Sequence, residues 1–185
     1  MIPKLKYLDH IDALRAIAVL LVLLFHVDLT LFKGGFLGVD VFFVISGFLI
    51  TRNIVHEFRS TGRFKFIRFY YRRVKRLLPS FFLTSVIVFV LGILLLSPSD
   101  FIQLTESIFM GSVALSNFYF LGESGYFDTA AKLKPMLHTW SLSVEEQYYF
   151  IWPLTLFIFL RFSRKIKTWL LTLALLTGGF VFKYI

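Results

Sequence analysis

Residues 13–50 read ALRAIAVLLVLLFHVDLTLFKGGFLGVDVFFVISGFLI, which is two apolar runs joined by a Lys-Gly-Gly turn. The first run, Ala13–Phe32, has about 20 residues, the length that an α-helix needs to cross a bilayer. The second run, Phe36–Ile50, extends towards Val55. Glycine at the junction favours a tight connection. The stretch therefore predicts a helical hairpin that crosses a membrane and returns.

The composition of the whole chain also indicates that much of it is solvated by lipid. Of its 185 residues 57% are hydrophobic, above the roughly 45–50% of soluble domains. The absence of Cys excludes disulfides, a thiol nucleophile and thiolate metal sites. A cleaved signal peptide is the alternative interpretation of the first run. Its length, and the Arg15 and His26 embedded in it, argue against that alternative.

Positive charge is concentrated in one block. The net charge is +9, and most of it lies in residues 52–79, which hold one acid, Glu57. Within this block, Lys65–Leu78 repeats apolar residues every three or four positions, which predicts an amphipathic helix on the membrane surface. Pro79 ends that helix or begins the next. Because apolar runs flank the block, we expect a cytoplasmic loop, with a cytoplasmic N-terminus, rather than a nucleic-acid-binding surface.

Beyond the basic block the apolar pattern is less regular. Three further runs are clearly apolar: Phe81–Leu96, Val144–Leu160 and Trp169–Phe182. A fourth, Phe101–Leu121, is rich in polar residues. Ser99 is expected to cap the helix that follows Phe81–Leu96. The positive cluster at 161–167 should be cytoplasmic, which requires an even number of crossings after Pro79. Residues 98–143 are therefore expected to be re-entrant or peripheral, within an all-α polytopic transmembrane bundle.

Two ionisable side chains lie inside the first run. Arg15 and His26 are eleven residues apart, close to three full helical turns, so both face one side of a helix at a separation of about 16 Å. Such side chains are costly in a membrane unless they face protein or water. The alternative is that Arg15 anchors the cytoplasmic end of the helix and His26 lies at the outer interface.

Asp40 begins the second run, and the hairpin can bring it beside His26. A carboxylate next to an imidazole fixes its tautomer and raises its basicity. The alternative is that Asp40 is a helix N-terminal acid that interacts with the macrodipole.

The segment His138–Tyr149, HTWSLSVEEQYY, is dense in polar groups at the edge of an apolar run. Ser143 and Glu146 have the spacing of a capping box. That leaves Glu145, a carboxylate entering the bilayer, for which Arg15 is a candidate partner. The sequence contains no HExxH metal motif and no G-x-S-x-G nucleophile elbow, so neither a metal nor a lone serine nucleophile is expected.

Three arginines, Arg72, Arg73 and Arg76, lie together on the predicted amphipathic helix. Two interpretations are open. They bind the anionic headgroups of lipids, or they bind the phosphates of a soluble cytoplasmic donor, for which Arg is well suited.

Together these pieces resemble the membrane-bound acyltransferase 3 family, whose members O-acylate polysaccharides, lipid-linked glycans and other cell-envelope molecules. The resemblance covers residues 8–160 and rests on five motifs in the family's order and spacing: IDALRAIAVLLVLLFHV, GGFLGVDVFFVISGFLIT, RFYYRRVKRLLPS, SNFYFLGESGYFD and LHTWSLSVEEQYYFIWP. Ala13 stands where the family usually has Gly, and Ala still fits a helix.

The resemblance implies a domain of roughly ten transmembrane helices, of which this chain would hold the N-terminal half. It implies transfer of an acyl group, acetyl above all, from cytoplasmic acyl-CoA to an envelope glycan across a bacterial-type inner membrane, with no permanently bound cofactor. The family's acyl-transfer His matches His26, its Arg partner matches Arg15, and its Glu matches Glu145 in preference to Glu146. With Asp40 these are the expected catalytic residues. The expected substrate contacts are Arg72, Arg73, Arg76, His138, Trp140 and Ser141.

Two other functions stay open. Intramembrane ionisable residues and re-entrant segments also mark the paths of small-solute transporters. The chain ends near an apolar run, so an inactive truncated fragment of the acyltransferase is the other alternative.

Overall fold

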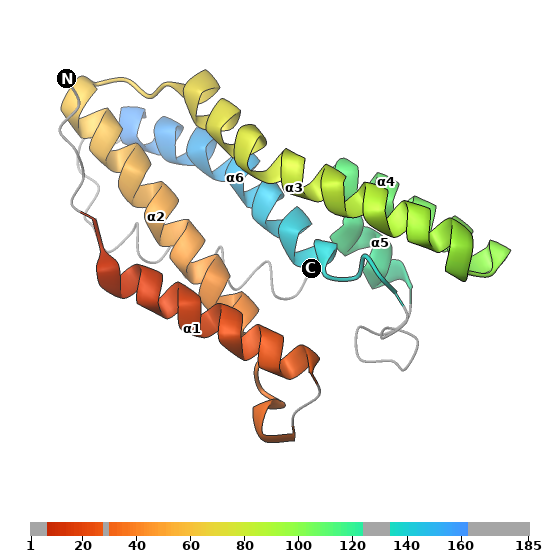
Figure 1. Cartoon of the computed structure of the whole chain (residues 1–185). Coiled ribbons are helices and arrows are strands. Elements are labelled where there is room, and N and C mark those ends of the chain that lie inside the picture. Colours follow the sequence, from red (N-terminus) through yellow and green to blue (C-terminus); the bar gives the residue numbers. More distant parts are fainter. Residues whose placement is uncertain (1–6, 28–29, 124–133, 163–185) are drawn as a thin grey trace. The chain divides into compact units, whose positions relative to one another are not determined.

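The computed structural model describes residues 7–27, 30–123 and 134–162 (Figure 1). Every regular element among these residues is a helix, as expected for an all-α chain. The last apolar run, the cations after Arg161 and the end of the SNFYFLGESGYFD motif lie outside the described residues. The chain divides into two compact units, the first made of Met1–Phe64 with Ile151–Ile185 and the second of Lys65–Phe150.

The first unit contains the predicted helical hairpin. Helix α1 spans Asp9–His26, a short 3₁₀ helix η1 spans Thr30–Phe32, and helix α2 spans Leu37–Thr61. Figure 1 shows α1 and α2 packed against each other. The first helix ends at His26 and does not continue to Phe32 as expected. The chain is reversing by then, because the Gly35 N–H donates to the Phe32 carbonyl oxygen at 2.8 Å.

Small residues allow the two helices of the hairpin to approach closely. Ala18 on α1 is 1% exposed, and a Cβ atom added to Gly38 on α2 would lie 2.5 Å from its carbonyl oxygen. A Cβ atom on Gly35 would overlap the carbonyl oxygen of Leu21. Close backbone packing of this kind holds membrane helices together where lipid removes the hydrophobic driving force. The two glycines therefore hold α2 against α1.

A polar contact holds α2 against the C-terminal part of helix α6 (Thr139–Phe162) within the same unit. Trp152 Nε1 donates to Thr51 Oγ1 at 2.7 Å, and Thr51 Oγ1 donates to the Gly47 carbonyl oxygen at 2.7 Å. The rings of Phe58 and Phe157 pack edge to face, with centroids 5.8 Å apart. The hydroxyl of Thr51 thus satisfies the indole N–H in an otherwise apolar contact.

The basic stretch 52–79 contains less loop than expected. Helix α2 continues to Thr61, where Gly62 takes a left-handed φ of 68° and donates its N–H to Phe58 at 2.8 Å. Helix α3 spans Phe66–Leu95, so Pro79 lies inside it and neither ends nor begins a helix. The proline removes one backbone hydrogen bond without breaking this 30-residue helix. The cytoplasmic location of the stretch stays a prediction.

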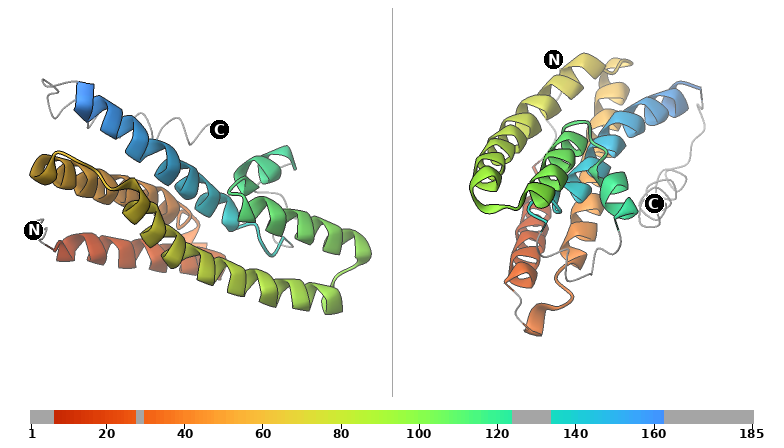
Figure 2. Two further views of the ribbon diagram at one scale, coloured as in Figure 1. Left: turned by 90° about the horizontal axis from the view of Figure 1, so that it is seen from above. Right: turned by 90° about the vertical axis from the view of Figure 1, so that its right-hand side faces the viewer.

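The second unit is organised around an apolar cluster. Helix α4 (Pro98–Ser112) lies beside α3 in both views of Figure 2. The buried residues of the cluster are Phe81, Leu104, Phe120 and Met136. Ser97, and not Ser99, caps α4, since its Oγ accepts the Asp100 N–H at 3.3 Å. Pro98 occupies the first position of the helix, where its missing N–H costs nothing, and this places the cap at the preceding residue.

The two helices after α3 are short. Helix α4 has 15 residues, which gives it a length of about 22 Å against about 30 Å for the hydrocarbon core of a bilayer. Helix α5 spans Ser116–Gly122, and Ala114 between them has a left-handed φ of 57°. These lengths favour the re-entrant or peripheral interpretation of residues 98–143, which stays a prediction.

Helix α6 begins at Thr139, so Ser143 lies inside the helix and the capping-box interpretation is wrong. The Ser143 side chain is used in packing instead. Its Oγ accepts the Ser116 N–H at 3.3 Å, and the two hydroxyl oxygens are 2.7 Å apart. Both residues are buried, so each hydroxyl supplies the partner that the other needs.

Among the described residues, α2 and α3 are the two helices that are long and apolar enough to cross a membrane. They support association with a membrane. A bundle of ten such helices stays a prediction.

The contact between α1 and α2 gives a direct test of the hairpin. We expect Gly38→Ala to destabilise the chain by about 1–3 kcal/mol, because the added methyl group meets backbone that cannot move aside. Gly34→Ala is the matched control, since a Cβ atom there meets nothing within 4 Å. Denaturation of the detergent-solubilised protein, followed by tryptophan fluorescence, measures both. Equal midpoints for the two variants would contradict the contact.

Candidate active site

His26 is the last residue of α1 and is exposed. Its Nδ1 lies 2.8 Å from the carbonyl oxygen of Val22, one helical turn earlier. A carbonyl oxygen can only accept a hydrogen bond, so Nδ1 carries the proton. In the neutral ring the lone pair is then on Nε2, the atom of the ring that can accept a proton. The main chain of α1 therefore sets the tautomer of the His26 ring.

Arg15 lies on the same stripe of α1, as its spacing from His26 predicts. Its side chain is 34% exposed, and Nη1 lies 3.2 Å from Asp12 Oδ1 in the preceding turn. Asp12 also accepts a hydrogen bond from the Tyr7 hydroxyl. Arg15 is thus partly neutralised by a carboxylate of its own helix. Glu145, the partner expected from the sequence, belongs to the other unit, so that ion pair stays a prediction.

Asp40 lies in the first turn of α2, where a negative charge is favoured by the helix dipole, and it is half-buried. The hydrogen bond that the structure gives the His26 ring, within the described residues, goes to Val22 and not to Asp40. The Val22 carbonyl therefore does the orienting that was expected of the Asp40 carboxylate. A role for Asp40 in acyl transfer stays a prediction.

The three arginines of α3 differ in their surroundings. Arg72 and Arg76 are exposed. Arg73 is half-buried, with its guanidinium carbon 4.8 Å from the centroid of the Tyr149 ring and 5.5 Å from that of Phe69. A guanidinium over aromatic faces is held by cation–π attraction and by packing. Arg73 therefore contributes to the contact between α3 and α6, and the other two side chains extend into the surroundings.

Tyr149 joins two of the predicted residues. Its hydroxyl donates a hydrogen bond to Glu145 Oε1, and the guanidinium of Arg73 stacks over its ring. The neighbouring Tyr70 hydroxyl donates to the Phe150 carbonyl oxygen at 3.0 Å, which fixes the same stretch of α6 against α3. Glu145 and the arginine motif are thus linked through one tyrosine ring. Sequence reasoning missed Tyr149, although its position four residues after Glu145 puts both on one helix face.

The other predicted substrate contacts lie around the start of α6. His138 is exposed, and its carbonyl oxygen accepts a hydrogen bond from Ser141 Oγ at 3.1 Å. Trp140 packs against the apolar cluster of the second unit. Trp140 therefore has a structural role whether or not it also meets substrate.

A buried polar network between α5 and α6 was not foreseen. Gln147 Nε2 donates to the Ala114 carbonyl oxygen at 2.6 Å and to Asn117 Oδ1 at 2.9 Å. These bonds hold the left-handed turn at Ala114, where the chain passes from α4 to α5. The density of polar residues in Phe101–Leu121 and His138–Tyr149 was the feature of the sequence that could have indicated this network.

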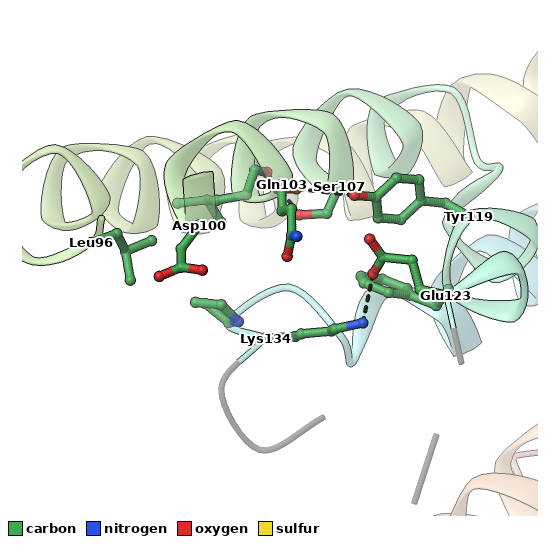
Figure 3. A pocket seen from close by; sticks show the side chains of 10 residues that line it. Leu96, Asp100, Gln103, Ser107, Tyr119, Glu123 and Lys134 are labelled. Carbon is green, nitrogen blue, oxygen red and sulfur yellow. Dashed lines mark hydrogen bonds and ion pairs between the residues drawn. The ribbon is translucent and has the colours of Figure 1, made fainter. Parts of the chain in front are cut away.

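A cavity of about 250 Å³ lies beside α4, also in the second unit (Figure 3). Its lining comes from the end of α3, from α4, from α5 and from the segment before α6: Leu96, Asp100, Gln103, Leu104, Ser107, Tyr119, Phe120, Glu123, Lys134 and Pro135. Lys134 Nζ and Glu123 Oε2 form an ion pair at 2.6 Å across it. Within the described residues no group of three or more His, Cys, Asp or Glu side chains could hold a metal ion.

Comparisons with known proteins give these features a context. The sequence model of the acyltransferase domain family matches residues 8–185. Peptidoglycan O-acetyltransferase OatA of Listeria monocytogenes is 35% identical over 163 residues, which cover 88% of this chain and 26% of that protein. O-acetyltransferase OatA of Staphylococcus aureus is 36% identical over 179 residues, which cover 94% of this chain and 29% of that protein.

The chain thus spans between a quarter and a third of the length of these relatives. No solved structure matches it. The family match extends over nearly the whole sequence and includes α1 with Arg15 and His26 and α3 with the three arginines. The chain belongs to the acyltransferase domain family.

Proposed function

We propose that the protein transfers an acetyl group from cytoplasmic acetyl-CoA to a hydroxyl group of a cell-envelope glycan. The observation that carries the proposal is the family match over residues 8–185. Relatives that bear the names peptidoglycan O-acetyltransferase and O-acetyltransferase support the acetyl group and the glycan. The chain spans between a quarter and a third of the length of those relatives, so the activity of the whole protein is part of the proposal.

His26 is the proposed general base. The acceptor hydroxyl gives its proton to Nε2 of His26, and its oxygen attacks the carbonyl carbon of the thioester. The carbon–sulfur bond breaks, and the leaving thiolate of coenzyme A takes the proton back from the imidazolium. Histidine is the side chain that most often performs both proton transfers in enzymes. The hydrogen bond from Nδ1 to Val22 supports this role because it leaves Nε2 free to accept.

The donor is proposed to bind at the basic end of α3. Arg72 and Arg76 are exposed cations that suit the phosphates of coenzyme A. We place this end of α3 in the cytoplasm. With two crossings by the hairpin before it, the N-terminus is then cytoplasmic too. The proposed location is the inner membrane. Arg15, on the stripe of α1 that carries His26, would orient the donor.

Loss of the base should remove the activity. We expect His26→Ala to lower transfer of labelled acetyl from acetyl-CoA to envelope glycan at least about 100-fold, the usual contribution of a general base. The assay uses membranes that contain the native protein.

His10→Ala is the matched control, since His10 is an exposed histidine of the same helix and should leave transfer unchanged. Wild-type transfer by the His26→Ala variant would end the assignment. A transporter, the rival function, would leave no labelled ester on the glycan in any variant.

The arginines of α3 should divide into two groups. We expect Arg76→Ala to raise KM for acetyl-CoA about tenfold, as for one lost phosphate contact, with little change in stability. We expect Arg73→Ala to lower the free energy of unfolding by about 1–2 kcal/mol, because it removes the cation–π contact with Tyr149.

S-acetylpantetheine, which lacks the phosphates of the nucleotide, separates binding from structure. The Arg76→Ala effect on KM should vanish with this shorter donor. An equal rise in KM for both donors would show that Arg76 does not contact the phosphates.

A further inference from the structure

The cavity beside α4 has an apolar floor and a polar rim. Leu104 and Phe120 are buried members of the apolar cluster, only 3% and 9% exposed. The rim carries carboxylates at Asp100 and Glu123, an ammonium at Lys134 and the amide of Gln103. Figure 3 shows these polar side chains gathered around the same space, with Tyr119 at one end. A ligand that fits must therefore offer both a hydrophobic face and several hydrogen-bonding groups.

The charge of the described rim disfavours the phosphates of the donor. Two carboxylates against one ammonium give the lining a net negative charge, which repels the phosphates of coenzyme A. Among the described lining residues the one ammonium, that of Lys134, is already paired with Glu123. Hydroxyl groups, which both donate and accept hydrogen bonds, suit a rim that mixes carboxylate and amide. A neutral polyol ring is the class of ligand that this chemistry favours.

The size agrees with a single ring. Sites for drug-sized ligands are usually about 300–1,000 Å³, and this cavity has about 250 Å³. The Tyr119 hydroxyl donates to Glu106 at 3.1 Å, and burial and that bond raise the pKa of Tyr119. The tyrosine therefore stays neutral and offers an aromatic edge to the cavity without adding a negative charge.

The place of the cavity along α3 separates it from the donor end. Leu96, in the lining, follows α3 directly, and Arg76 lies on the same helix. The 20 residue steps from Arg76 to Leu96 extend about 30 Å along the axis, which is the thickness of the hydrocarbon core. If Arg76 is at the cytoplasmic face, the cavity is therefore at the outer face.

We propose that this cavity binds one sugar ring of the acceptor glycan, with Gln103 as the residue that recognises its hydroxyl groups. The inference deepens the proposed function and rests on it for the identity of the acceptor. Gln103 is exposed on α4, and within the described residues its side-chain amide makes no hydrogen bond. The other polar groups of the rim are already engaged: Asp100 accepts from Ser97 Oγ at 2.6 Å, and Glu123 pairs with Lys134. Gln103 is thus the group with free donors and an acceptor for a ligand.

The test compares variants of the native protein with chitotetraose, a soluble N-acetylglucosamine oligomer, as the probe. We expect Gln103→Ala to raise KM for chitotetraose about tenfold and to leave KM for acetyl-CoA unchanged. Gln103→Trp, which fills the mouth of the cavity, should abolish saturation by the oligomer. Ser112→Ala, an exposed change on the same helix outside the cavity, is the matched control. An unchanged KM for chitotetraose in both Gln103 variants would overturn the proposal, as would equal rises in KM for both substrates.

A binding measurement keeps this proposal separate from the proposed function. Saturation-transfer NMR of chitotetraose with the His26→Ala protein detects binding without turnover. Binding that is lost in the His26→Ala/Gln103→Trp double variant supports the sugar site, even if no acetyl transfer is ever found. Absence of binding to the His26→Ala protein, or binding that survives Gln103→Trp, would overturn it.

Discussion

The need to satisfy polar groups inside the chain governs this structure, because lipid offers them no hydrogen bonds. The backbone answers with helices throughout the described residues. Polar side chains form hydrogen bonds with nearby backbone or with one another. The Thr51 hydroxyl donates to the Gly47 carbonyl oxygen and accepts a hydrogen bond from the Trp152 indole N–H. The buried hydroxyls of Ser116 and Ser143 bond to each other. The His26 ring follows the same rule, and its bond to the Val22 carbonyl sets the tautomer that acyl transfer would use. The hydrogen bond that satisfies the His26 ring thus also fixes its tautomer.

Hydrophobic runs and glycines predicted the hairpin because both act locally. The two apolar runs of residues 13–50 became α1 and α2, and the Gly-Gly turn connects them. The helix ends were less predictable. Polar residues after Ile50 suggested a loop, yet α2 continues to Thr61, since a helix ends where its cap is and not where its polarity changes. Pro79 failed as a boundary for a related reason: in a 30-residue helix the loss of one hydrogen bond is small beside the bonds that remain.

The geometry of the candidate site was predictable where its residues share one helix and unpredictable where they meet across helices. The common stripe of Arg15 and His26 follows from helical geometry alone. The differing surroundings of Arg73 and Arg76 do not, because they depend on where the Tyr149 ring of α6 lies against α3. Ser143 shows the same limit. Its spacing to Glu146 fitted a cap, and its actual partner is Ser116, 27 residues earlier in the chain.

The two ends of α3 differ in the chemistry that they offer, and this difference gives the helix a direction. Exposed arginines at one end suit phosphate, whereas carboxylates, an amide and aromatic edges at the other suit a neutral ring. On the proposed assignment of the two ends, the donor phosphates and the acceptor ring would bind about the thickness of a bilayer apart. The thioester would then have to extend from the phosphate end towards the acceptor. Coenzyme A has a long pantetheine arm, and a donor held by its phosphates can extend that arm into the protein while its charges stay in water.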